Sequence, residues 1–452
     1  MTMLSLSQGG GVYHREHTMT RRRELQARAA ARRWELISTD DVRSHAQTLS
    51  LLRASLVRNF DLVTSVGRQF VKEAGSTWVQ DLLAPIAPWL DEDGDDEDDA
   101  SASVTGRQVY DPQELADGKF ATVAGLQLHY KLVEPANVDA VDVDAPVVVM
   151  LHGFNASLFS WRANAQEVAD RTGLRVVLMD RPPFGLSDRP TAWGDGRDLE
   201  FDPYEPAGGA RLALMLVREA LGFESNKLVL VGHSAGSLTA LLMHELAPDA
   251  VAAMIFVAPA LPTTPENSFQ RRATFGQQLR IVLGRAIMAS DEAGVRYIRR
   301  MITKQRKDLL ENGLDYQPHP LTSSQYDSQS IDGITEDWSA AEEAALQEAV
   351  DGYLRPLKTE GWEMGALLNL RSFWLPSSYD YGRIGRDVPI QIVAGERDPL
   401  TLGAKTLHEI LTLQEQSVCE YVEFEDTGHV VMEVKPVEFN DAVSTFVRRH
   451  VV

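Results

Sequence analysis

The pentapeptide Gly232-His233-Ser234-Ala235-Gly236 restricts the possible folds of this chain more than any other feature. Residues 227–231 before it predict an apolar strand, and residues 237–244 after it predict a helix. A serine hydroxyl is a weak nucleophile, so an enzyme that uses one must expose it sharply and place a base beside it. A tight turn from strand to helix exposes the serine, and only small neighbours fit such a turn. The segment therefore predicts an α/β fold with Ser234 as a candidate nucleophile.

Three further segments place polar residues directly after strand-like runs. Residues 146–151 lead into His152-Gly153-Phe154, residues 388–394 into Gly395-Glu396-Arg397-Asp398-Pro399, and residues 417–424 into Glu425-Asp426-Thr427-Gly428-His429. Ligands of α/β sheets bind at the carboxyl ends of the strands, where these residues are expected to meet. Along the chain the order is serine, acid, histidine, which is typical of one class of serine hydrolase.

Together, the H-G-F, D-R-P-P-F-G-L-S, G-H-S-A-G, G-E-R-D-P and D-T-G-H segments resemble the α/β-hydrolase superfamily over residues 119–448. The resemblance implies a mostly parallel central sheet flanked by helices, with a helical cap inserted over the active site. The chain departs from many relatives at Ser237, where they carry a further glycine, and a serine is small enough to fit there.

The resemblance assigns a catalytic role to three side chains. Ser234 is the expected nucleophile, and His429 is the expected general base and later acid, because imidazole titrates near neutral pH. Asp398 is expected to accept the other ring N–H of His429 and to fix its tautomer. Glu396 and Asp426 are rivals for this role, but the family places its acid after the seventh strand, which favours Asp398.

Backbone groups and neighbouring rings complete the expected site. The N–H groups of Phe154 and Ala235 are expected to form the oxyanion hole, which stabilises negative charge on the substrate oxygen. His152 is expected to brace the loop by hydrogen bonding. Trp161 and Phe184 are expected either to border the pocket or to pack in the core.

The turn that carries Ser234, called the elbow, holds the nucleophile, and the residue type there differs between the branches of the superfamily. Epoxide hydrolases and haloalkane dehalogenases use a carboxylate nucleophile where Ser234 stands. Esterases and lipases need only the residues already named, so we expect a serine hydrolase that cleaves an acyl ester. A thioesterase, a carbon–carbon bond hydrolase and a hydrolase-fold ligand receptor remain alternatives. Neither a zinc-protease motif nor a nucleotide-binding glycine motif is present, so no cofactor is implied.

Pattern and charge divide the chain into four parts. Strands alternate with helices in residues 106–261 and 387–452, which we expect to form the two halves of the hydrolase core. Residues 262–386 are mostly helical by pattern and form the expected cap. Residues 1–105 comprise a basic arm, amphipathic helices and an acidic linker that holds eight acids within residues 91–99.

The expected partners follow from the cap, the charge and the first part of the chain. An apolar cap favours a hydrophobic small molecule or a lipid as substrate. Its side chains are expected to line a channel or to pack in the cap's own core: Tyr353, Trp362, Met364, Leu367, Leu368, Phe373 and Trp374. The formal net charge of −21 argues against nucleic-acid binding. Residues 52–90 predict amphipathic helices that pack on the core or contact a membrane surface.

Location is predicted from what surrounds the expected core. Residues 1–33 are rich in arginine and poor in acids, as organellar presequences are, and they lack the apolar segment of a secretory signal. Cys419 is the single cysteine, and no apolar run is long enough to cross a bilayer. We therefore expect an intracellular protein, cytoplasmic or organellar, without a transmembrane helix.

Overall fold

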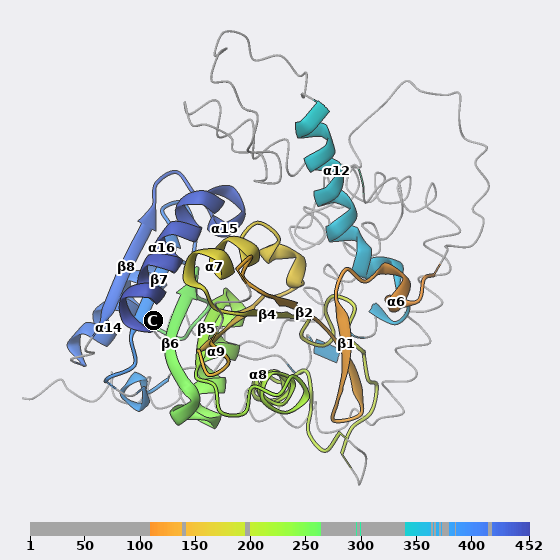
Figure 1. Ribbon diagram of the computed structural model, residues 1–452, viewed down its shortest axis with the longest axis horizontal. Helices are drawn as coiled ribbons and strands as arrows, with labels where there is room; N and C mark the ends of the chain where they lie inside the picture. The colour runs from red at the N-terminus through yellow and green to blue at the C-terminus, as the bar shows by residue number, and fades with distance from the viewer. Residues whose placement is uncertain are drawn as a thin grey trace, which may run out of the picture. The chain divides into compact units, whose positions relative to one another are not determined.

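A computed structural model describes residues 109–137, 142–194, 199–263, 340–362, 379–384, 386–414 and 418–452, with a few helical positions between 295 and 372 (Figure 1). The basic arm, the amphipathic helices and the acidic run expected in residues 1–105 lie outside these residues. Within the described part of the chain, no helix is long and apolar enough to cross a membrane.

The described strands form one sheet of eight strands in the order β1-β2-β4-β3-β5-β6-β7-β8. Strands β3 to β8 pair in parallel, whereas β1 with β2 and β2 with β4 pair antiparallel. The mostly parallel sheet predicted from the sequence is thus confirmed. The strands are β1 (Lys119–Val123), β2 (Leu126–Val133), β3 (Val147–Leu151), β4 (Val176–Met179), β5 (Leu228–His233), β6 (Val251–Val257), β7 (Ile390–Gly395) and β8 (Cys419–Phe424).

A two-residue hairpin opens the sheet. Val123 of β1 pairs with Leu126 of β2, so only Ala124 and Gly125 form the turn. Both have a positive φ, 47° and 76°, the backbone twist that lets two residues join antiparallel strands. The hairpin predicted from the alternating residues around 120–130 is therefore present.

Side-chain alternation along β3 shows why helices cover both faces of the sheet. Val148 and Met150 belong to the apolar cluster on one face, and Val147 and Val149 belong to the cluster on the other. Parallel strands buried on both faces carry such continuous apolar runs. Helices α7 (Ala165–Thr172) and α16 (Pro436–His450) cover the first face; α8 (Pro206–Leu214), α9 (Ala235–Leu246) and α14 (Thr401–Leu413) cover the second (Figure 1).

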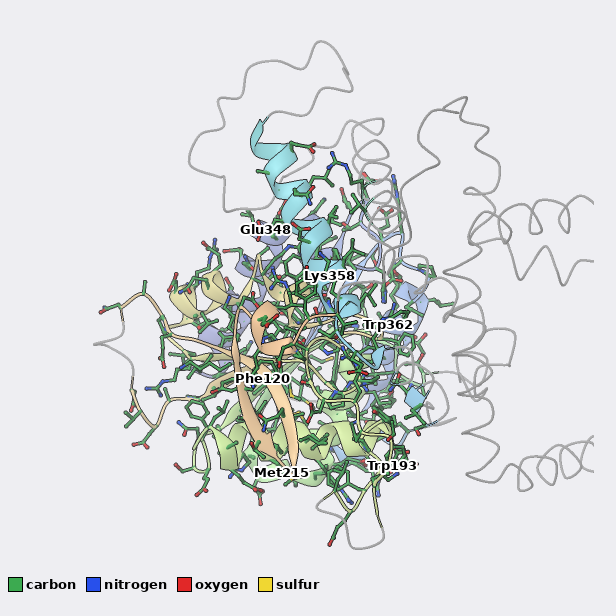
Figure 2. The ribbon with its side chains drawn as sticks, turned by 90° about the vertical axis from the view of Figure 1, so that its right-hand side faces the viewer. Phe120, Trp193, Met215, Glu348, Lys358 and Trp362 are labelled. Atoms are coloured by element: carbon green, nitrogen blue, oxygen red, sulfur yellow. The ribbon has the colours of Figure 1, made fainter. Side chains whose placement is uncertain are left out.

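The chain between β6 and β7 contributes helix α12 (Ala340–Leu354) and the turn η6 (Arg355–Lys358). The helix has the bounds that the sequence pattern predicts. Trp362 packs in a small apolar cluster with Leu346, Val350, Leu354 and Leu357, so this ring belongs to local packing. Figure 2 shows Glu348 on α12 and Lys358 and Trp362 farther along the chain, beside the core. The side chains of Met364, Leu367, Phe373 and Trp374 lie outside the described residues.

Candidate active site

Ser234 lies in a strained turn between β5 and α9. Its φ of 52° and ψ of −117° place it in a region that residues with a side chain rarely adopt. The flanking glycines allow a close approach of backbones: a Cβ on Gly232 would lie 2.5 Å from the Gly236 oxygen, and one on Gly236 would lie 2.2 Å from the Leu151 oxygen. Ser237 fits as expected, because its buried Oγ donates to the Gly232 oxygen over 2.7 Å.

The predicted acid and base are hydrogen bonded to each other. His429 Nδ1 lies 2.9 Å from Asp398 Oδ2, with the Asp398 side chain 1% exposed and that of His429 37% exposed. Asp398 Oδ1 also accepts the Leu400 N–H over 2.9 Å, which holds the carboxylate in place. His233, next to Ser234, donates from Nε2 to the His429 backbone oxygen over 2.9 Å. His429 thus contacts Asp398 and the residue before Ser234, and the three predicted residues follow the carboxyl ends of β5, β7 and β8.

The two rival acids have other partners. Glu396 Oε2 accepts the backbone N–H of Asp426 over 2.9 Å, which ties together the loops that follow β7 and β8. The Asp426 carboxylate pairs with Arg397 at the protein surface. Asp398, which follows Glu396 by two residues, is the acid placed against His429.

The loop after β3 runs directly against the elbow. A Cβ on Gly153 would lie 3.2 Å from Ser234 Cβ and 2.9 Å from His233 Nδ1. Phe154, the next residue, thus lies in the loop that borders the serine. Ala235 is the first residue of α9, so its N–H has no acceptor within the helix. Both expected oxyanion donors therefore lie on segments that meet at Ser234.

His152 braces this loop, as predicted. Its Nε2 accepts the Arg181 backbone N–H over 3.0 Å, and its Nδ1–H donates to the Gly153 oxygen over 2.8 Å. These two bonds require a neutral ring. Burial, only partly offset by the nearby Asp180 charge, lowers the pKa of His152 to about 4 and so keeps the ring neutral.

The rings beside the site are buried. Trp161 packs edge-on against His233, with ring centroids 6.4 Å apart, and has no exposed surface. Phe184 packs edge-on against Phe154 at 5.5 Å and is also buried.

Burial, followed by the proximity of His429, lowers the pKa of His233 to about 3, so His233 serves as a neutral hydrogen-bond donor.

Asp180 is a buried carboxylate whose role the sequence analysis did not predict. Its Oδ1 accepts the Leu158 N–H over 2.7 Å, and its Oδ2 accepts the His129 Nδ1–H over 2.7 Å. Burial would raise its pKa, but the hydrogen bonds that it accepts, first that from His129 and then that from the Leu158 N–H, help to outweigh burial and hold the pKa below its ordinary value. The available signal was an aspartate directly after β4 together with a histidine on β2, whose ring the structure buries.

Comparison with curated proteins gives local matches to several relatives. Epoxide hydrolase A of Mycobacterium tuberculosis is 31% identical over 150 residues, which are 32% of this chain and 42% of that protein. A bovine (lyso)-N-acylphosphatidylethanolamine lipase is 31% identical over 149 residues, 32% of this chain and 40% of the relative. The rat 1-acylglycerol-3-phosphate O-acyltransferase ABHD5 is 30% identical over 126 residues, 28% of this chain and 33% of the relative. The matched part spans less than half the length of each of these proteins.

Solved structures and a family model cover more of the chain. A laboratory-evolved variant of potato epoxide hydrolase is 19% identical with a TM-score of 0.49, covering 74% of this chain and 99% of that structure. An esterase from Thermogutta terrifontis is 18% identical with a TM-score of 0.46, covering 75% and 100%. The model of the alpha/beta hydrolase fold matches residues 146–436, well over half of the 452 residues. The chain therefore belongs to the alpha/beta hydrolase fold family.

Proposed function

We propose that this protein is a cofactor-independent serine hydrolase that cleaves an acyl ester through an acyl-enzyme. One observation carries the proposal: the 2.9 Å hydrogen bond between His429 and Asp398 lies beside the strained elbow that presents Ser234. An acid that orients a histidine next to a serine in such a turn is the arrangement that activates a hydroxyl for attack on a carbonyl.

In the first half of the reaction, Ser234 Oγ attacks the carbonyl carbon of the ester. His429 accepts the hydroxyl proton at Nε2 and delivers it to the leaving alcohol, while the covalent bond between Ser234 and the acyl group forms. Asp398 holds Nδ1–H of the ring and stabilises the imidazolium that forms in between. The N–H groups of Phe154 and Ala235 stabilise the negative charge on the carbonyl oxygen.

In the second half, water replaces the alcohol. His429 removes a proton from the water, the resulting nucleophile attacks the acyl-enzyme, and the same proton returns to Ser234 as the acid leaves. The two tetrahedral intermediates carry their charge at one place, so one pair of backbone donors serves both steps.

The nucleophile and the relatives bear on the class of substrate. Ser234 occupies the position at which epoxide hydrolases use a carboxylate, so we favour an ester over an epoxide although epoxide hydrolases are among the relatives. The bovine relative is named as a lipase of an N-acyl phospholipid, and the rat relative as an acyltransferase of an acylglycerol phosphate. These names support a hydrophobic or lipid-like acyl substrate.

Replacement of the serine tests the proposal directly. For Ser234→Ala we expect kcat for a short p-nitrophenyl ester to fall on the order of 10⁶-fold, because the triad acts as a unit. Ser444→Ala is a matched control, since Ser444 is also buried but lies on α16, and it should keep full activity. Undiminished hydrolysis by Ser234→Ala would contradict the assignment. Stoichiometric acylation of the wild type without turnover would favour the ligand-receptor alternative.

A further inference from the structure

Three side chains from three separate elements meet outside the triad. Arg162 follows the 3₁₀ helix η2 (Leu158–Trp161), Tyr353 lies near the end of α12, and Glu433 lies on α15 (Val431–Val434). Arg162 Nη1 donates to Glu433 Oε2 over 2.8 Å, and the Tyr353 hydroxyl donates to the same oxygen. One carboxylate oxygen therefore joins the chain after β3, the chain after His429, and a helix inserted between β6 and β7.

The cluster is shielded from water, which strengthens its interactions. The side chains of Arg162 and Glu433 are 17% and 10% exposed. Burial would lower the pKa of Arg162, but the charge of Glu433 and its hydrogen bond to the guanidinium outweigh burial and hold the pKa above its ordinary value. Burial and the Glu433 charge both raise the pKa of Tyr353, so its hydroxyl keeps its proton and donates. Hydrogen bonds to a charged, buried acceptor are among the strong ones in proteins.

Arg162 and Glu433 lie close in sequence to the two loops that carry the candidate site, the loop with Phe154 and the loop with His429. Glu433 follows His429 by four residues, and Arg162 follows Phe154 by eight. A second bond joins the same two segments, because Asn164 Nδ2 donates to the Met432 oxygen over 3.0 Å. The segment after the oxyanion loop and the helix after the histidine are thus held together as a pair.

Helix α12 docks closely on this pair. A Cβ on Gly352 would lie 2.1 Å from Phe159 Cζ, so the helix backbone rests on the Phe159 ring. Phe159 and Tyr353 pack edge-on with ring centroids 5.5 Å apart, and the Arg162 guanidinium lies 4.3 Å from the centre of the Phe159 ring. Tyr353 therefore reaches Glu433 from a helix whose position is set by direct ring contact.

We infer that Tyr353 and Glu433 are positioning residues for His429. Through the bond between these two residues, helix α12 keeps the catalytic histidine in the position that the reaction requires. The inference rests on the proposed function, in which His429 is the general base. It assigns the inserted segment a part in catalysis itself, in addition to any part in binding the acyl chain. Loss of the Tyr353 bond would leave Glu433 with one partner fewer and loosen α15 and the loop before it.

Tyr353→Phe is the sharpest test, because it removes one hydroxyl and keeps the ring on Phe159. On p-nitrophenyl acetate, a substrate too small to need the inserted segment for binding, we expect kcat to fall about tenfold, as expected for a displaced catalytic group. We expect KM to stay within about twofold, since the ester contacts do not change. The control is Tyr421→Phe, which also removes a tyrosine hydrogen bond to a carboxylate, that of Glu423 on β8, and should leave kcat unchanged.

A double-mutant cycle and an activity-independent measurement complete the test. Glu433→Gln should lower kcat at least as much as Tyr353→Phe, and the double variant should be no slower than Glu433→Gln alone, because both changes break one bond. Amide hydrogen exchange of residues 425–434 should be faster in Tyr353→Phe than in the wild type. This measurement needs no ester turnover. If the protein had no esterase activity, the proposed function would be wrong, but the exchange rates would still show whether Tyr353 stabilises the segment that carries His429. Unchanged kcat, a rise in KM alone, or unchanged exchange in Tyr353→Phe would overturn the inference.

Discussion

At the scale of single residues, the candidate site places buried groups with fixed protonation states beside the ring that the proposed mechanism uses as a base. His152 and His233 are buried and stay neutral, with pKa values lowered to about 4 and about 3. Asp180 is buried and stays ionised through its bond to His129. His429 is the partly exposed member of the set, with 37% of its side chain accessible. Buried groups of fixed protonation state thus lie around the more accessible ring of His429, to which the proposed mechanism gives the proton transfer.

Replacement of the predicted acid tests its role. Asp398→Asn should lower kcat roughly 10⁴-fold, because an amide favours the wrong tautomer of His429 while the geometry remains. Asp426→Asn is the control, since that carboxylate pairs with Arg397 on the surface, and its kcat should stay within about twofold of the wild type. Rates measured on one soluble ester decide the point. The opposite ranking of the two variants would mean that the acid is misassigned.

The lowered pKa of His233 predicts how stability depends on pH. In the unfolded chain this ring binds a proton below about pH 6.5, whereas in the folded protein it stays neutral down to about pH 3. Below about pH 6.5 the unfolded state therefore gains protons first, and folding loses stability as the pH falls. Between pH 6.5 and 4.5 the free energy of unfolding, measured with denaturant, should fall by about 2 kcal/mol more for the wild type than for His233→Gln. If the free energy of unfolding depended on pH in the same way for the two proteins, the prediction would be wrong.

At the scale of elements, the sequence predicted the strands that carry the site and missed the contacts between inserted and core elements. The segments before His152, Ser234, Asp398 and His429 are apolar because parallel strands are buried on both faces, so their ends could be read directly. The bond between Tyr353 and Glu433 depends instead on where α12 docks. No local pattern reports that position, because it is set by ring packing between residues far apart in the chain.

The close packing of the turn around Ser234 predicts that a methyl group added at Gly236 destabilises the fold. A Cβ on Gly236 would lie 2.2 Å from the Leu151 oxygen and 2.8 Å from the His152 oxygen, both backbone atoms that cannot move aside cheaply. Gly236→Ala should therefore lower the free energy of unfolding by about 3 kcal/mol, although alanine favours helices. Gly428→Ala is a matched control, because no atom lies within 4 Å of the added Cβ, and its stability should change little. Equal effects in the two variants would exclude the clash as the cause.

At the scale of the whole molecule, the candidate site gathers residues from position 152 to position 433 at the carboxyl ends of the parallel strands. Every described strand lies between Lys119 and Phe424. The family model likewise begins at residue 146. The part of the chain before residue 109 thus supplies none of the candidate catalytic groups, and its contribution is open to a direct experiment.

Two truncated chains separate the roles proposed for the first hundred residues. A chain of residues 101–452 keeps every described strand and every candidate catalytic residue, and removal of the acidic run at 91–99 should cost little stability. We expect it to fold and to hydrolyse soluble p-nitrophenyl esters at a rate within about twofold of the full chain. A chain of residues 76–452 serves as the control, because it also retains the apolar residues Trp78, Leu82, Leu83, Ile86 and Trp89.

The comparison of the two chains then assigns the amphipathic segments. If residues 52–90 contact a membrane surface, the 101–452 chain should keep its rate on soluble esters and lose activity on lipid dispersions, because apolar area buried in the interface drives such binding. Vesicle co-sedimentation of both chains and of the full protein measures that loss directly. A soluble 76–452 chain beside an insoluble 101–452 chain would show instead that residues 76–100 cover apolar surface of the hydrolase core, because exposed apolar surface promotes aggregation.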